Sequence, residues 1–314
     1  MLTYIQPIGF KSTNRYMHKS LSLSLFTLFS SFSICIAQSA TDLIALDAKA
    51  TGSKLKLELG SEQKITNRNL YDNQPNFINE KQLAFSAADE KGNHDIIIYT
   101  FSSGKFTNLT KTPHLNEFSP AITDCGLYVS AVTVEKDGKQ RLWLYPTNFG
   151  EPELLYDDIE PVGYYDWYDN RAAMFVLGQP NTLIYPFAKE NILNISQNVG
   201  RTVKKKPKSS IITYLDKNDS KEINGQKVFA IKGFDIEKQR SFNYGYSIPG
   251  EEDFIWLNKN LLLMGKGNEL FFRKANKQDW QSAGYIKIEG YQDISRMAYS
   301  HDLKKLVLVM ERTN

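Results

Sequence analysis

Few residues in this chain could do covalent or acid–base chemistry. Three histidines follow the first 37 residues (His94, His114 and His301), together with a single cysteine, Cys125. An α/β-hydrolase serine would need a Gly-x-Ser-x-Gly turn, and the nearest string, Gly245–Pro249, ends in proline. The sequence has no His-Glu-x-x-His, no Cys-x-x-Cys, no P-loop and no Gly-x-Gly-x-x-Gly after a strand. We therefore expect no catalytic residue, no metal site and no cofactor.

A second group of residues could recognise a polar partner instead. Arg201 and Arg296 carry positive charge, and Glu252 and Asp253 carry negative charge. Each stands at or near the start of a short apolar run that is typical of a strand. Whether these four side chains meet depends on how those strands are arranged in space.

The strand-like runs recur with a long period. One recurring run ends in a short apolar strand whose anchor residues are Ile96, Leu142, Leu183, Val228 and Leu270. These anchors are separated by 46, 41, 45 and 42 residues. A four-stranded blade of a β-propeller occupies about 40–45 residues. Since helical periodicity is almost absent after residue 37, the sequence predicts an all-β propeller.

Each anchor strand is preceded by another apolar run and a sharp turn, as a hairpin requires. The preceding runs are Gln82–Ser86, Leu127–Val132, Ala172–Leu177, Ile211–Leu215 and Leu261–Met264. The turns that join the two runs contain glycine, asparagine or aspartate. An outer strand such as Phe106–Leu109 or Glu153–Tyr156 follows the anchor. The repeating unit is therefore a four-stranded antiparallel sheet.

The two ends of the chain complete one blade together. The last segment supplies only an inner strand, Ile294–Tyr299, and a second strand, Leu306–Met310. The missing third and fourth strands are found near the N-terminus, at Asp42–Leu46 and Lys54–Leu59. Pairing of these segments would close the ring and leave no open edge between the first and last blades. We therefore expect six blades, closed by N-terminal strands that pair with the C-terminal blade.

The units at 64–110 and 111–156 resemble the TolB-like, WD40-like (PD40) repeats of bacterial envelope proteins. The resemblance lies in Gln74-Pro75-Asn76-Phe77, in Gly92–Tyr99, in Asn108–Pro113 and in Glu117-Phe118-Ser119-Pro120. Later units depart from the pattern, because the usual Ser-Pro-Asp-Gly turn becomes Ser300-His301-Asp302-Leu303 in the last one. The resemblance implies a six-bladed propeller over essentially the whole chain after residue 37. It implies a non-enzymatic role in binding another protein or a peptide.

The first 37 residues have the pattern of a secretory signal peptide. A basic start at Met17-His18-Lys19 precedes an apolar run from Leu21 to Ala37. Met17 is the better start codon, and a single membrane anchor is the alternative reading. We expect a signal peptide over 1–37 and one propeller domain over 38–314. That places the protein in the periplasm or outside the cell, with no stable membrane insertion once the leader is removed.

The charge balance narrows the classes of partner. The chain has 38 lysines and arginines and 35 acidic residues. The surplus of three corresponds to Lys11, Arg15 and Lys19, so residues 38–314 carry 35 charges of each sign. A nucleic-acid binder needs a one-sided basic field. We therefore expect no nucleic acid as a partner, and we expect a monomer.

Three polar segments are interpreted as turns. Cys125 and His94 fall in turns of the repeat. The basic run Lys204–Lys208 lies between the two inner strands of blade four, where a solvated loop or a site for an acidic partner is possible. Asp216–Glu222 has part of a calcium-loop rhythm but lacks the glycine at position six and the distal glutamate. We interpret that segment as a polar hairpin turn.

The predicted site is the mouth of the central channel. In a propeller the first strand of each blade lines the channel, so the segments that lead into these strands share one face. The predicted binding residues at this mouth are Arg201, Glu252, Asp253, Arg296, Asp166, Trp167, His114 and Glu117. We expect the two arginines and the pair Glu252–Asp253 to form an ion-paired cluster, which could hold blades together or bind a ligand. Trp167, with Tyr164 and Tyr165, could equally pack between blades.

Two classes of function remain open from the sequence. The first is a secreted, non-enzymatic propeller that binds an envelope protein or a peptide at the channel mouth. The second is a propeller enzyme or a carbohydrate-binding protein that uses the central channel. A blade-only relative that has lost an ancestral role is a third possibility. Bound metal would favour the second class, although Arg201 and Arg296 would repel a cation beside Asp166 and Asp253.

Overall fold

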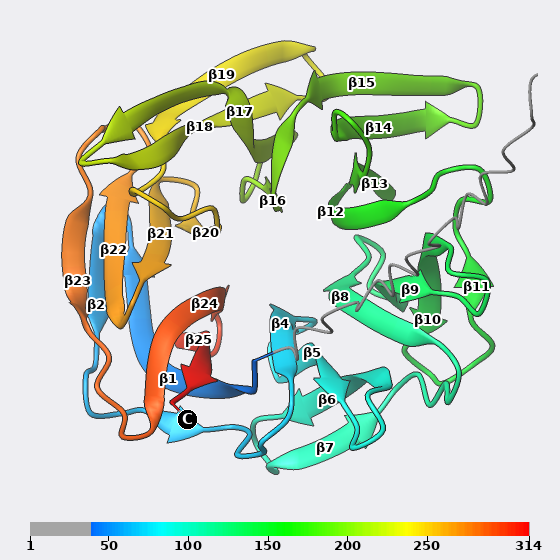
Figure 1. The fold of residues 1–314 in the computed structure, drawn as a ribbon, viewed down its shortest axis with the longest axis horizontal. Helices are drawn as coiled ribbons and strands as arrows, with labels where there is room; N and C mark the ends of the chain where they lie inside the picture. Colours follow the sequence, from blue (N-terminus) through cyan, green and yellow to red (C-terminus); the bar gives the residue numbers. More distant parts are fainter. Residues whose placement is uncertain (1–38, 314) are drawn as a thin grey trace, which may run out of the picture. The chain divides into compact units, whose positions relative to one another are not determined.

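The computed structural model describes residues 39–313, which form six small antiparallel sheets arranged in a ring (Figure 1). The described residues contain strands, turns and no helix, and none of them could therefore cross a membrane as a helix. The predicted signal peptide lies outside the described residues. The all-β, six-bladed architecture predicted from the repeat is confirmed.

Five blades are built from four consecutive strands each. Their bounds are as follows: blade one, β4 (Asp72–Phe77), β5 (Gln82–Ala88), β6 (His94–Thr100) and β7 (Lys105–Asn108); blade two, β8 (Asn116–Ile122), β9 (Tyr128–Val134), β10 (Gln140–Pro146) and β11 (Glu153–Leu154); blade three, β12 (Val162–Tyr168), β13 (Arg171–Val176), β14 (Thr182–Ala188) and β15 (Asn191–Gln197); blade four, β16 (Val199–Lys205), β17 (Ile211–Ile223), β18 (Gln226–Asp235) and β19 (Arg240–Tyr246); blade five, β20 (Phe254–Asn258), β21 (Leu261–Lys266), β22 (Glu269–Lys274) and β23 (Gln281–Tyr285). In each, the first strand lines the channel and the fourth lies at the outside.

Blade six joins the two ends of the chain. It runs from the inner strand β24 (Tyr291–Ser300) through β25 (Lys305–Arg312) to β1 (Thr41–Thr51) and β2 (Lys54–Leu57), and β3 (Gln63–Lys64) also pairs with β1. β1 and β25 are antiparallel over seven residue pairs, from Thr41 opposite Glu311 to Asp47 opposite Lys305. The predicted closure of the ring by N-terminal strands is therefore confirmed.

A buried ionic cluster reinforces this closure. Asp42 on β1 is fully buried and accepts hydrogen bonds from Arg312 Nε and Tyr291 Oη, each at 2.7 Å. It also accepts one from Thr66 Oγ1 at 2.9 Å, in the segment that leads to blade one. A buried carboxylate needs such partners, because an unpaired charge away from water is costly. Asp42 thus ties the first strand of the chain to the last.

The apolar core is divided among the boundaries between blades. Six clusters of buried side chains are found among the described residues, one for each pair of adjacent sheets. Leu142 and Met174, for example, meet between blades two and three, and Leu183 and Ile212 meet between blades three and four. Alternate residues of every strand therefore face one neighbour or the other, which explains why the inner two strands read as almost continuous apolar runs.

The structure corrects two of the predicted turns. Asp216–Glu222 does not form a turn, because β17 continues to Ile223 after a register shift between Asp216 and Ser220. The hairpin turns instead at Asn224-Gly225, where both residues have positive φ, as a two-residue type I′ turn requires. His94 likewise begins β6 and is half-buried. Cys125 does lie in an exposed turn, between β8 and β9.

Candidate functional site: the channel mouth

The inner strands do not pair regularly with their neighbours. Every one of the six shows a register shift along its ladder to the second strand. In blade four the shift lies between Val199 and Val203, and in blade six one lies between Ile294 and Arg296. A β-bulge re-aims the side chains next to it. Arg201 and Arg296 both stand at such a shift, on the side of the strands that faces the channel.

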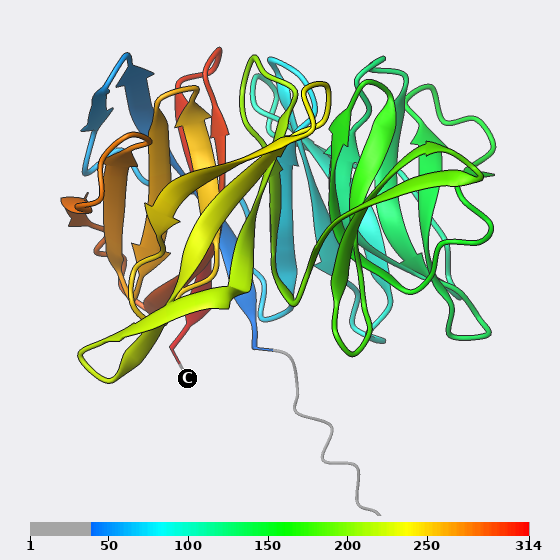
Figure 2. The same cartoon turned by 90° about the horizontal axis from the view of Figure 1, so that it is seen from above.

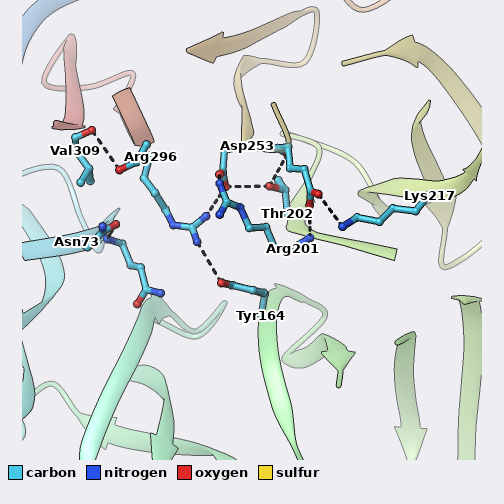
Figure 3. A network of polar contacts seen from close by, with 11 residues as sticks. Asn73, Tyr164, Arg201, Thr202, Lys217, Asp253, Arg296 and Val309 are labelled. Atoms are coloured by element: carbon cyan, nitrogen blue, oxygen red, sulfur yellow. Dashed lines mark hydrogen bonds and ion pairs between the residues drawn. The ribbon is translucent and has the colours of Figure 1, made fainter. Parts of the chain in front are cut away.

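Asp253 is the centre of the predicted ion-paired cluster, which is present (Figure 3). It precedes β20 and forms ion pairs with both Arg201 and Arg296. Thr202 Oγ1 lies 3.1 Å from the same carboxylate. The side chain of Asp253 is 15 % exposed, that of Arg296 19 % and that of Arg201 45 %. One carboxylate therefore holds two guanidinium groups from different blades, and Arg201 keeps an open side toward solvent.

Two residues extend the cluster beyond the sequence prediction. Tyr164 Oη accepts a hydrogen bond of 3.2 Å from Arg296, whose guanidinium carbon lies 5.2 Å from the Tyr164 ring centre. Lys217 Nζ lies 2.7 Å from Glu252 Oε1. Tyr164 was recognised in the sequence as an aromatic residue, and we interpreted it as part of the packing between blades. No sequence signal pointed to Lys217, because its position depends on the unexpected length of β17.

The surroundings of Arg296 favour its charged form. Burial alone would lower the pKa of Arg296, but its interactions with Asp253, Tyr164 and Tyr71 together outweigh burial, so the pKa is raised. Burial raises the pKa of the neighbouring Glu251. Three cations, Arg201, Arg296 and Lys217, face the two carboxylates Glu252 and Asp253. Such a site can attract a carboxylate or a polar peptide group and offers no nucleophile.

A cleft opens above this cluster. Its volume is about 360 Å³, and its lining includes Arg201, Arg296 and the aromatic side chains Tyr71, Phe118 and Tyr164. Below the arginines the channel narrows, and the cavity there has only about 70 Å³. Small-molecule sites usually need about 300–1,000 Å³. The accessible space is therefore at the mouth rather than within the channel.

Two of the predicted binding residues lie below the mouth. The inner strand of blade three begins at Val162, so Asp166 and Trp167 fall within β12 rather than before it. Asp166 accepts a hydrogen bond of 2.7 Å from the backbone N–H of Lys205 and so joins blades three and four. Trp167 is 4 % exposed and donates to Ser130 Oγ at 2.8 Å, which places it in the packing between blades two and three.

The remaining two predicted residues also lie outside the cluster. Glu117 is fully buried and accepts hydrogen bonds from Thr112 Oγ1 at 2.7 Å and Tyr145 Oη at 3.3 Å. Burial raises its pKa to about 7. His114 is exposed in the loop that leads to β8. The geometry thus assembles Arg201, Glu252, Asp253 and Arg296, and it leaves Asp166, Trp167, Glu117 and His114 in other surroundings.

Comparison with known proteins identifies the fold. No family profile matches the chain, and no curated protein matches it. Among solved structures, TolB from Acinetobacter baumannii aligns with a TM-score of 0.52 and 12 % identity, over 87 % of this chain and 64 % of that one. A TolB candidate from Agrobacterium tumefaciens aligns with a TM-score of 0.64 and 9 % identity, over 88 % of this chain and 100 % of that one. The described residues therefore have a TolB-like six-bladed propeller fold. The chain spans less than two thirds of the Acinetobacter protein.

Proposed function

We propose that this propeller is a non-enzymatic binding protein whose channel-mouth face recognises an envelope protein or a peptide. The observation that carries the proposal is the contrast in space around Arg296, with a cleft of about 360 Å³ above it and a cavity of about 70 Å³ below. A substrate of a channel enzyme would have to enter the smaller space. A side chain or a chain end of a partner can occupy the larger one.

The composition of the mouth supports a protein partner. Arginine and tyrosine are enriched among the residues that dominate binding at protein interfaces. Arg201 is close to half exposed, and it is already oriented by Asp253. Tyr71 and Phe118 supply apolar surface at the rim of the same cleft. Preorganised side chains lose less conformational freedom on binding than free ones do.

The long hairpin of blade four adds to this face. β17 and β18 continue to pair from Ser220 opposite Phe229 to Ile223 opposite Gln226, and the hairpin projects from the ring on the side of the C-terminus (Figure 2). Lys217, at its base, is the residue that pairs with Glu252 at the mouth. Ile223 near the tip is 38 % exposed. We propose that the hairpin widens the surface available to the partner.

The proposed location is the periplasm or the outside of the cell. The support is the sequence of residues 1–37, with its basic start and its apolar run up to Ala37. Removal of that segment would begin the chain at Gln38, directly before β1. We propose that the propeller then acts as a monomer.

The test is capture of the protein with its partner from the envelope fraction of its own organism after mild cross-linking. Ser39 lines the mouth cleft and the C-terminus lies on the same side, so the affinity tag belongs in an exposed turn such as Ser102–Gly104. Arg201→Glu reverses the exposed charge of the cluster. Arg171→Glu is the matched control, because that arginine is 40 % exposed in blade three.

We expect one reproducible protein partner that is lost with Arg201→Glu and retained with Arg171→Glu. Thermal melting of both variants must first show cooperative transitions near that of the parent protein. Recovery of the propeller alone, or loss of the partner with both variants, would contradict the proposal. In the first case, a channel that binds metal or carbohydrate becomes the function to test.

A further inference from the structure

A second cleft lies on the face opposite the channel mouth. It is enclosed by turns of three blades: Pro207-Lys208 after β16, Lys259-Asn260 after β20, and two turns of blade six. In Figure 2 the turns of blade six, blue after β1 and red after β24, stand on the side away from the C-terminus. The cleft has a volume of about 600 Å³. That lies within the range of about 300–1,000 Å³ of small-molecule sites.

Two hydrogen bonds, one between blades five and six and one within blade six, connect the walls of this cleft. Asn258 Nδ2 donates to the carbonyl of Gly52 at 3.2 Å, which joins blade five to blade six. Tyr299 Oη accepts a bond of 3.0 Å from the backbone N–H of Ala50. Trp256 and Tyr299 supply aromatic surface to the lining. The two hydrogen bonds fix the turn between β1 and β2 relative to Asn258 and Tyr299.

Positive charge outweighs negative charge in the lining of this cleft. Lys208 and Lys259 line the cleft, are exposed and form no ion pair with any carboxylate of residues 39–313. Lys206 lies behind them, with its Nζ 5.3 Å from the Trp256 ring centre. Burial and, to a smaller extent, the charge of Lys259 lower the pKa of Lys206. The lining includes one acidic side chain, Asp302.

We propose that this cleft binds a phosphate monoester carried on a sugar-sized ring. Lys208 and Lys259 would contact the phosphate, since lysine binds phosphate as a point charge. The ring would pack against the aromatic lining formed by Trp256 and Tyr299. The same chemistry occurs in free sugar phosphates and in phosphorylated headgroups of lipids.

The test is isothermal titration calorimetry at low ionic strength, where charge–charge contacts are least screened. The probes are myo-inositol 1-phosphate, uncharged myo-inositol, and phosphatidylcholine vesicles that contain phosphatidylinositol 4-phosphate. The variant Lys208→Gln/Lys259→Gln removes the two charges of the cleft. The control Lys81→Gln/Lys105→Gln removes two exposed charges of blade one on the same face, Lys81 from the turn before β5 and Lys105 from the start of β7.

We expect binding of the phosphorylated probe but not of myo-inositol, with affinity at least tenfold lower in Lys208→Gln/Lys259→Gln and within twofold of the parent in the control. Binding of free myo-inositol 1-phosphate would indicate a soluble sugar phosphate as the ligand. Binding to the vesicles alone would indicate a lipid headgroup. Binding to neither overturns the proposal. Equal weakening by both double variants also overturns it, because the attraction would then be a general effect of net charge.

Discussion

Asp253 and Arg296 meet across the boundary between blades five and six, and the same carboxylate holds Arg201 from blade four. The ion pairs therefore connect three consecutive blades at the point where the channel opens. This arrangement stabilises the ring and also fixes the direction in which the half-exposed Arg201 faces solvent. Asp253 therefore serves the stability of the ring and also orients Arg201 for the binding that we propose, and each role can be tested separately.

Asp253→Asn should destabilise the propeller. It leaves two arginines without their carboxylate, and Arg296 is largely buried, so we expect a loss of about 1–3 kcal/mol in the free energy of unfolding. Denaturant unfolding measures it. Asp157→Asn is the control, because the Asp157–Lys189 pair is about 70 % exposed and such pairs contribute about 0–1 kcal/mol. Equal losses in the two variants would show that Asp253 has no special structural role.

Glu117 should make stability fall as pH rises. Burial raises its pKa from 4.5 to about 7, so between these values the folded protein binds more protons than the unfolded chain. The free energy of unfolding then decreases with rising pH. The contribution of Glu117 is fully present below pH 4.5, is lost progressively toward pH 7 and is absent above it. A shift of this size corresponds to about 3 kcal/mol.

The measurement is denaturant unfolding of the parent protein and of Glu117→Gln at pH 5 and pH 8. Because glutamine does not ionise, the variant should gain about 2.5 kcal/mol relative to the parent between the two pH values, somewhat less than the full shift because unfolded Glu117 is already largely ionised at pH 5. Glu190→Gln, in an exposed turn, should show no such gain. A pH-independent difference between Glu117→Gln and the parent would mean that Glu117 ionises normally in the fold.

Asp42→Asn should weaken the closure of the ring. The substitution removes the buried partner of Arg312, for which the expected cost is about 3 kcal/mol, at the lower end of the range for buried pairs because Arg312 is 26 % exposed. Asp47→Asn removes the pair with Lys305 from the same two strands, in which the carboxylate is 49 % exposed, and should cost under about 1 kcal/mol. Thermal melting compares the two variants. Similar melting temperatures for the two variants would show that Asp42 has no special role in joining β1 to β25.

Deletion of residues 41–60 removes the N-terminal strands altogether and so tests whether the ring needs them. It deletes β1 and β2 and leaves β25 as an unpaired, apolar edge, including Leu306 and Leu308, which are otherwise fully buried. Such an edge pairs readily with other chains. We expect an insoluble or aggregated product in size-exclusion chromatography. A soluble truncation that melts cooperatively would show that the ring does not need its N-terminal strands.

The fold could be predicted from the sequence because its signals are repeated. The anchors Ile96, Leu142, Leu183, Val228 and Leu270 all lie in the third strand of their blades, and the period counts the blades. The ends of individual strands could not be predicted where a blade departs from the repeat. The long hairpin of blade four was missed because its polar residues resemble a turn, although Asn224-Gly225 was a type I′ signal.

The site could be predicted only in part. Arg201, Arg296 and Asp253 were found because their strands must converge on the channel. Trp167 and Glu117 were misplaced because the mouth depends on where each inner strand begins, and on which face a bulge turns each side chain toward. A shift of one residue along a strand exchanges a channel position for a position between blades. No periodicity in the sequence resolves that difference.

The most direct test of the mouth as a binding face is photo-cross-linking from matched positions. Benzoylphenylalanine replaces Phe118, which lines the mouth cleft, or Phe149, which is 57 % exposed in the turn after β10. Both residues belong to blade two, but they lie on opposite faces, and Phe149 is the more exposed of the two. After irradiation of the envelope fraction, we expect a cross-linked protein partner from position 118 and none from position 149. Cross-links from position 149 alone, or from neither position, would contradict a protein-binding mouth.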